Sequence, residues 1–303
     1  MEAPVPTVPL TPGPRRRLRW ILLTVLAVLV GVVVWQTTSA RIHPRAVWVW
    51  SDRMMRDTLA GDSLFAWARR HRIDRFYQHV EPLLLEDPDA VAAFLRRART
   101  RGFTVEALLG DPAWLAAPDS ALARVDRLLS LHDRLGTDTL AAMHLDVEPY
   151  ALPEWRQREA VLVTAFQVLI ERVQRRRASR TLPLHVDIPL WYDAVRDPGD
   201  TTGSLLAWLM PRVEGVTVMA YATDPQTLWP ALARETASAR REGTALAIGV
   251  ETSCGVGVDV SFCTLGRTRL ERMLATVERR LGDDAVWGGT AIHFYPDAVR
   301  LLP

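Results

Sequence analysis

The feature that most constrains the fold of this 303-residue chain is a regular alternation of short β-type segments with amphipathic segments of helical period. The β-type segments are rich in Val, Ile, Thr and aromatic residues, which favour strands. They are Ala46–Trp50, Ile73–Val80, Thr104–Leu109, Ala141–Glu148, Leu182–Trp191, Gly215–Thr223, Thr244–Thr252 and Trp287–Tyr295. Between them we expect helices over Ser63–Arg72, Pro88–Arg101, Ser120–Leu135, Pro153–Arg177, Leu205–Pro211, Thr227–Arg241 and Thr268–Leu281.

Strands that alternate with helices form parallel βαβ units. Eight such units in about 260 residues match the count and size of an α/β protein with a (β/α)₈ fold, a TIM barrel. An open doubly wound sheet is the alternative, but no Gly-rich turn follows the first β-type segment. We expect the helix after the eighth strand to be nearly absent, because the chain stops at Pro303.

The sequence predicts four regions in the chain, one of which is a membrane segment in the N-terminal part. Residues 1–19 are rich in Pro and Arg and predict a disordered cytoplasmic tail. Residues 20–36 are apolar and predict a transmembrane helix or a signal segment. Residues 37–45 then form a linker, and 46–303 form the barrel. The Arg cluster before residue 20 favours a cytoplasmic N-terminus and an extracytoplasmic barrel, anchored in the membrane or secreted after cleavage at Ala40.

Composition excludes several classes of function. The chain has 37 Lys+Arg and 35 Asp+Glu residues, for a formal charge of +2, so a strongly basic nucleic-acid-binding protein is excluded. Every basic residue of this set is Arg, so Schiff-base chemistry on lysine is excluded as well. Cys254 and Cys263 permit either a disulfide or two free thiols, because spacing alone does not decide between them.

Side chains alternate between the two faces of a strand, so the polar positions of each segment predict what faces the barrel interior. In the fourth segment, every second residue from Met143 to Val147 is apolar. The residues that alternate with them, His144, Asp146 and Glu148, are polar. The outer face packs on helices and must be apolar, so the polar set points inward. The same period selects Trp48, Trp50, Glu106, His185, Asp187, Met219, Tyr221, Glu251, His293 and Tyr295.

Catalytic residues of such barrels lie at the carboxyl ends of the strands, and four predicted inward residues fall there: Asp146, Glu148, Tyr221 and Glu251. Several carboxyl groups that converge inside a barrel exceed what packing requires, because burial of unpaired charge is costly. Aromatic residues such as Trp191 also lie at or just after strand ends, where rings stack on the apolar faces of sugars.

The fourth β-type segment resembles the family-18 glycoside hydrolases, the chitinases and their relatives. That family carries DxxDxDxE on its fourth strand, and Asp146 and Glu148 match its last two acidic positions. Ala141 and His144 stand at the two earlier acidic positions. The sequence therefore keeps half of the motif.

Two further segments are similar to the same family. Met219-Ala220-Tyr221 matches M-x-Y, although Ala222 replaces the Asp that usually follows. Gly288-Gly289 looks like the glycine pair of the eighth strand, with His293 in place of the usual Trp. Three other segments are similar to uncharacterised bacterial glycosidase-like barrel proteins: Trp48-Val49-Trp50, Asp187-Ile188-Pro189 and Glu251-Thr252-Ser253.

The resemblance implies hydrolysis of a glycosidic bond in a polysaccharide, including one with N-acetyl sugars, without a cofactor. Glu148 protonates the glycosidic oxygen, and the acetamido group of the sugar attacks the anomeric carbon while Asp146 and Tyr221 orient it. Repulsion by Asp146 is expected to raise the pKa of Glu148. His144 replaces the missing Asp as a hydrogen-bond partner. The expected substrate-binding residues are Trp48, Trp50, Glu106, His144, Asp187, Trp191, Met219, Glu251, His293 and Tyr295.

Three alternatives remain open from the sequence. The first is a retaining glycosidase with Glu148 as acid and Glu251 as nucleophile. The second is a non-catalytic glycan-binding barrel, which the lost motif positions favour. The third is a metal-dependent hydrolase that uses histidines expected near the barrel interior, namely His79, His144, His185 and His293.

Overall fold

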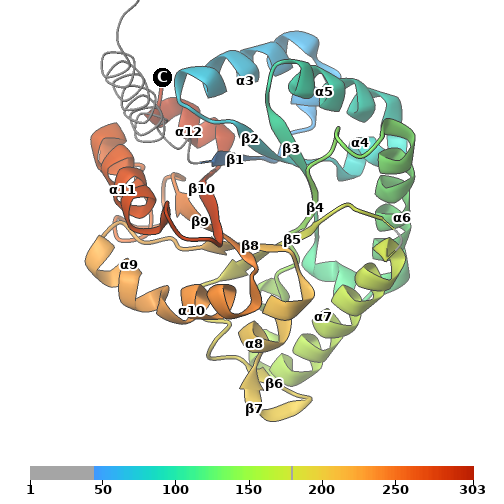
Figure 1. The fold of residues 1–303 in the computed structure, drawn as a ribbon, viewed down its shortest axis with the longest axis vertical. Coiled ribbons are helices and arrows are strands. Elements are labelled where there is room, and N and C mark those ends of the chain that lie inside the picture. The colour runs from blue at the N-terminus through green and yellow to red at the C-terminus, as the bar shows by residue number, and fades with distance from the viewer. Residues whose placement is uncertain (1–43, 179) are drawn as a thin grey trace, which may run out of the picture. The chain divides into compact units, whose positions relative to one another are not determined.

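The computed structural model describes residues 44–178 and 180–303, which form a closed barrel of eight parallel strands inside a ring of helices (Figure 1). Around the barrel the strands follow one another as β1 (Arg45–Val49), β2 (Arg75–His79), β3 (Thr104–Leu109), β4 (Ala142–Leu145), β5 (Leu184–Pro189), β8 (Gly215–Met219), β9 (Ala245–Glu251) and β10 (Trp287–His293). Pairing of β10 with β1, with Arg45 opposite Thr290, closes the ring. The predicted barrel is confirmed, and the open-sheet alternative is wrong.

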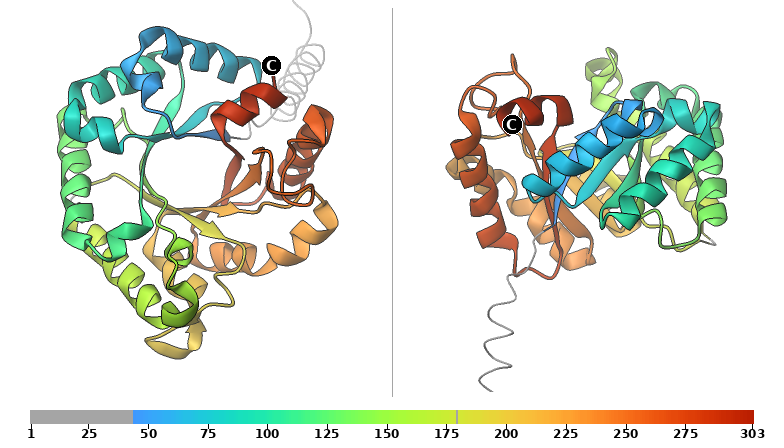
Figure 2. Two further views of the ribbon diagram at one scale, coloured as in Figure 1. Left: turned by 180° about the vertical axis from the view of Figure 1, so that it is seen from behind. Right: turned by 90° about the horizontal axis from the view of Figure 1, so that it is seen from above.

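The helices cover the outside of the barrel in every view (Figure 2). They are α2 (Arg53–Arg56), α3 (Thr58–Arg70), α4 (Glu81–Glu86), α5 (Pro88–Thr100), α6 (Pro118–Leu135), α7 (Trp155–Arg177), α8 (Leu205–Leu209), α9 (Pro225–Ala231), α10 (Ala233–Glu242), α11 (Gly266–Leu281) and α12 (Tyr295–Leu301). Short 3₁₀ turns occupy Pro112–Leu115 (η1), Pro149–Ala151 (η2) and Met210–Arg212 (η3), and a hairpin joins β6 (Arg196–Asp197) to β7 (Asp200–Ser204). Side chains of Asp57, Asp87 and Ser204 accept hydrogen bonds from backbone N–H groups in the first turns of α3, α5 and α8.

Two expectations about helices are wrong. The final helix is present as α12, because Leu302 just after it is buried and its carbonyl accepts a hydrogen bond from Trp67 Nε1 at 2.7 Å. The predicted single helix over Thr227–Arg241 is two helices, since α9 ends one residue after Pro230, which has no backbone N–H to donate.

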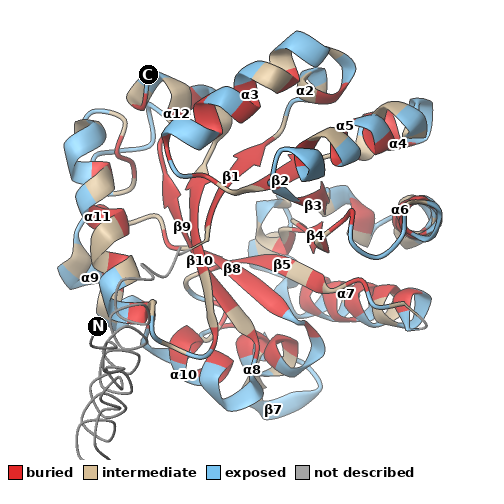
Figure 3. Cartoon of the chain, turned by 45° about the horizontal axis from the view of Figure 1, so that its top comes forward, coloured by how far each residue is buried: buried red, intermediate tan, exposed pale blue. Residues whose placement is uncertain are grey.

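Figure 3 shows buried residues on the strands and on parts of the surrounding helices, and the buried hydrophobic residues form two clusters. Along β1, Val47 and Val49 join the large core between the strands and the helices, whereas Ala46 and Trp48 join a small cluster inside the barrel. This period of two is the predicted alternation of faces. The remaining space inside the barrel is filled by polar side chains, which build the candidate site.

The predicted tail 1–19, the predicted membrane segment 20–36 and most of the predicted linker lie outside the described residues. The barrel begins with β1 at Arg45, one residue before the predicted boundary. Within residues 44–178 and 180–303, no helix has the length and apolar character that a membrane span requires.

Candidate active site

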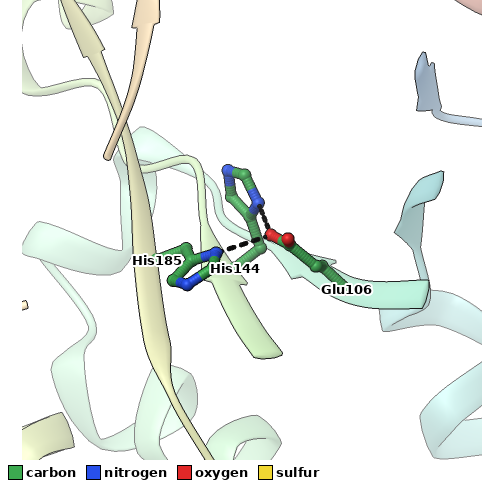
Figure 4. Close-up of side chains that lie close together, drawn as sticks. All are labelled: Glu106, His144 and His185. Carbon is green, nitrogen blue, oxygen red and sulfur yellow. Dashed lines mark hydrogen bonds and ion pairs between the residues drawn. The ribbon is translucent and has the colours of Figure 1, made fainter. Parts of the chain in front are cut away.

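A buried cluster of ionisable groups occupies the interior of the barrel (Figure 4). Glu106 on β3 lies between two imidazole rings, with its Oε2 2.7 Å from Nδ1 of His144 on β4 and 2.9 Å from Nδ1 of His185 on β5. Its other oxygen accepts a hydrogen bond from Arg75 of β2 at 3.0 Å. Burial raises the pKa of Glu106, but His185 and His144 outweigh it and hold the pKa well below its usual range.

The cluster continues from His144 to Asp187 on β5. His144 Nε2 lies 2.9 Å from Asp187 Oδ1, and Trp48 Nε1 donates to Asp187 Oδ2 at 2.9 Å. Burial lowers the pKa of His144, but Asp187 and Glu106 face both of its nitrogens and raise the pKa to about 10. His144 is therefore an imidazolium that donates a hydrogen bond to a carboxylate on each side.

Glu106, His144 and His185 are also a group with the geometry to hold a metal ion, since one ligand atom from each lies within 4.8 Å of the others. The arrangement fits hydrogen bonding better. Each imidazole Nδ1 points at the same Glu106 oxygen, and the guanidinium of Arg75 already balances that carboxylate. A cation at this point would have to displace the proton of His144 and approach Arg75.

The two motif acids lie just beyond β4, at its carboxyl end. The strand ends at Leu145, three residues earlier than predicted, and the Asp146 backbone N–H donates to the carbonyl of Leu109 at 2.8 Å. Gly110 makes this approach possible, because a Cβ there would lie 2.0 Å from the carbonyl oxygen of Asp146. The acids are thus held by the β3–β4 contact and by the η2 turn that begins at Pro149.

The pKa of Asp146 and that of Glu148 are both raised. Burial, the charge of Asp187 and the charge of Glu148 raise the pKa of Asp146 well above its usual value. Burial and Asp187 also raise the pKa of Glu148, while Tyr150 and His293 oppose that rise. The rise that the sequence predicts for the pKa of Glu148 is present, and burial is its largest cause. Asp146 Oδ1 is buried and has no hydrogen-bond partner among the described residues.

Glu251, the last residue of β9, forms hydrogen bonds through both of its carboxylate oxygens. Its Oε1 accepts hydrogen bonds from the backbone N–H groups of Thr252 and Ser253 and from Ser253 Oγ, each at 2.7 Å. Its Oε2 lies 2.9 Å from His293 Nδ1, and His293 Nε2 accepts from Trp50 Nε1 at 3.2 Å. Burial raises the pKa of Glu251, but these hydrogen bonds lower it below its usual value. Because an indole N–H only donates, the His293 proton lies on Nδ1 and points at Glu251.

Tyr221 follows β8 by two residues and joins this group, with its ring 5.8 Å from the ring of His293. Burial raises its pKa well above the usual value, and four carboxylates add to the rise: Glu251, Asp187, Asp146 and Glu148. The phenol of Tyr221 therefore stays protonated among the acids and can donate a hydrogen bond.

A disulfide loop supports the Tyr221 segment. Cys254 and Cys263 are bonded, with their Cα atoms 5.2 Å apart, which decides the alternative that the sequence leaves open. Two atoms of Thr223 contact this loop: its N–H donates to the carbonyl of Asp259 at 3.0 Å and its Oγ1 donates to that of Val258 at 2.8 Å. The loop after β9 thereby holds the loop after β8.

Aromatic residues flank Glu148 on the β5 side. The hydroxyl of Tyr150 donates a hydrogen bond to Glu148 Oε1. The Tyr150 ring lies 4.8 Å from that of Trp191, which is 37% exposed, and 6.3 Å from that of Tyr192. Tyr150 is absent from the predicted site residues. Its position two residues after Glu148 is the signal that could have found it.

Most of the predicted site residues come together, but Tyr295 and Met219 do not, and His79 belongs only to the metal-hydrolase alternative. Tyr295 opens α12, and its ring lies 5.2 Å from Trp67 of α3, in the outer core. His79 lies beside Trp50, with ring centres 5.4 Å apart, and its Nε2 is 3.8 Å from Glu81. Met219 ends β8 half-buried and takes no part in the polar contacts described above.

Solved structures of other proteins share the fold that carries this site. No protein-family model matches the chain, and no curated protein sequence matches it. A family-18 chitinase from Pseudoalteromonas aurantia is similar in structure, with a TM-score of 0.54 and 9% identity over 83% of this chain and 94% of that one. A candidate α-L-fucosidase from Bacteroides thetaiotaomicron gives 0.51 and 13% over 83% and 87%. At these identities the likeness shows a shared fold, a divergent chitinase-like TIM barrel.

Proposed function

We propose that the protein hydrolyses a glycosidic bond in an N-acetylated polysaccharide, with Glu148 as general acid and the substrate's own acetamido group as nucleophile. One observation carries this proposal. Glu148, half-buried and with a raised pKa, lies at the carboxyl end of β4 beside the still more strongly perturbed Asp146. A raised pKa favours the protonated form of the acid, which proton transfer to a leaving group requires. The fold shared with a chitinase supports the proposed substrate class.

Glu148, Asp146 and Tyr221 have separate roles in the proposed reaction. Glu148 gives its proton to the glycosidic oxygen as the bond from that oxygen to the anomeric carbon breaks. The acetamido oxygen bonds to the same carbon, and the buried, unpaired Oδ1 of Asp146 accepts a hydrogen bond from the acetamido N–H. The Tyr221 phenol donates to the acetamido oxygen and orients it. Water then attacks the anomeric carbon and gives one proton to the Glu148 carboxylate, while the bond from that carbon to the acetamido oxygen breaks and the acetamido group is restored.

Glu251 is less suited to the role of nucleophile in a retaining mechanism. Four hydrogen bonds from Thr252, Ser253 and His293 occupy its two oxygens. These bonds stabilise the carboxylate and would have to be broken or weakened for an attack on carbon. The substrate-assisted route avoids this cost.

The experiment compares two matched substrates with the full-length protein. We expect release of reducing ends from N-acetylglucosamine oligomers and none from the deacetylated oligomers, which lack the acetamido nucleophile. Glu148→Gln should abolish the release, whereas Glu154→Gln, an exposed carboxylate six positions later, should leave it unchanged. Equal cleavage of both substrates would support the Glu251 mechanism instead.

The lost motif positions favour a second candidate, a non-catalytic glycan-binding barrel. His144 is locked between two carboxylates where the family carries an acid. Binding of the oligomers without release of reducing ends, unchanged in Glu148→Gln, would support this second function.

We also propose that the barrel is extracytoplasmic and attached to the membrane through residues 20–36, or secreted after cleavage at Ala40. The Cys254–Cys263 disulfide supports this location, because disulfides persist in oxidising compartments. External protease should digest the barrel in spheroplasts that express the full-length protein. Protection from the protease would refute the proposed location.

A further inference from the structure

We propose that Tyr150 is a positioning residue that fixes the carboxyl group of Glu148 and leaves Oε2 as the oxygen that carries the proton. This role rests on the proposed function, since it gives the acid its orientation toward a leaving group. The geometry is a hydrogen bond from the Tyr150 hydroxyl to Glu148 Oε1, within the short η2 turn that follows β4.

The ring of Tyr150 is held independently of this hydrogen bond. It packs edge-on against Trp191 at 4.8 Å and against Tyr192 at 6.3 Å. Burial and the charge of Glu148 raise the pKa of Tyr150 well above its usual value, so the phenol keeps its proton. A fixed ring with a protonated hydroxyl is a donor, and it keeps Oε1 in the role of acceptor.

The consequence appears when Glu148 gives up its proton. A hydrogen bond from a phenol to a neutral carboxyl group becomes charge-assisted once that group is a carboxylate, and such bonds are roughly twice as strong. The Tyr150 contact therefore strengthens as the proton leaves Oε2, and an interaction that grows along the reaction lowers the barrier. Tyr150 itself exchanges no proton with the substrate.

Other charged and titratable groups also act on Glu148. Burial and Asp187 of β5 raise its pKa, whereas Tyr150 and His293 of β10 lower it. Tyr192 and Tyr221 lie within the electrostatic influence of Glu148 but form no hydrogen bond with it in the described structure. Among these groups, Tyr150 is the one bonded directly to the acid.

Tyr150→Phe removes the hydroxyl and keeps the ring, so it tests the hydrogen bond alone. The pKa of Glu148 should rise, which carbon NMR of labelled glutamate in the full-length protein measures without substrate. The high-pH limb of the hydrolysis profile should move upward with it. The value of kcat should fall roughly tenfold to a hundredfold, the cost of one hydrogen bond to a charged group, with KM little changed.

Tyr192→Phe is the matched control, because its hydroxyl is buried in the same aromatic group and has no hydrogen-bond partner among the described residues. It should leave the Glu148 pKa in place. An unchanged Glu148 pKa in Tyr150→Phe would overturn the positioning role. A protein that releases no reducing ends but shows the pKa rise would refute hydrolysis and still support the hold of Tyr150 on Glu148.

Discussion

A buried carboxyl group far from the proposed acids makes the stability of this barrel depend on pH. Glu235 lies in the first turn of α10 and is 0% exposed. Neither of its oxygens receives a hydrogen bond from another described residue. Burial, followed by the nearby charge of Asp193, raises its pKa from 4.5 to about 7, although its own backbone N–H and Arg234 oppose the rise.

The sign and size of the effect follow from linkage. The pKa of Glu235 is higher in the folded than in the unfolded chain, so its contribution to the free energy of unfolding is complete below pH 4.5. That contribution is lost as the pH rises through about 7. A pKa difference of this size corresponds to about 3 kcal/mol, because one pKa unit is worth about 1.4 kcal/mol.

Glu235→Gln removes the titration and keeps the shape of the protonated side chain. Urea unfolding followed by circular dichroism between pH 4.5 and 9 gives the free energy of unfolding of both proteins. The difference between variant and wild type should shift by about 3 kcal/mol in favour of the variant as the pH rises. Glu159→Gln, which changes an exposed carboxylate on α7, should show no such shift. Parallel curves for wild type and Glu235→Gln would refute the reasoning.

Three further predictions concern the elements that support the site. Replacing His144 with Ala leaves two buried carboxylates without their shared cation and should lower the free energy of unfolding at pH 7 by about 3–5 kcal/mol in urea titrations. Changing Cys254 and Cys263 to Ser should lower it by about 2–3 kcal/mol, and the reductant dithiothreitol should then have no added effect. Gly110→Ala should lower the Tm and the rate of hydrolysis together, because its Cβ meets a backbone oxygen 2.0 Å away. Gly136→Ala is the control, because Gly136 has a φ of +82° and no atom lies within 4 Å of the Cβ that alanine would add, so that only backbone strain is expected. An equal loss of activity in Gly136→Ala would contradict the steric explanation.

The alternation of β-type and helical segments was sufficient to predict the barrel, because each parallel strand needs a crossover helix and each apolar face needs a partner. The same local period placed Trp48, Glu106, His144 and Asp187 on the inner face of their strands. It could not give the ends of β4 and β8, so the predicted strands ran through Glu148 and Tyr221, which lie in loops. Strand ends depend on the register of neighbouring strands, which the local sequence does not encode.

The sequence by itself determined which residue types line the barrel and which motif acids follow its fourth strand. Only the tertiary structure decided their partners. Closure of the barrel brings His144 between Glu106, 38 residues before it, and Asp187, 43 residues after it, and makes it an imidazolium. The physical reason is that a proton's affinity depends on burial and on charges within a few ångströms, and those neighbours come from other strands.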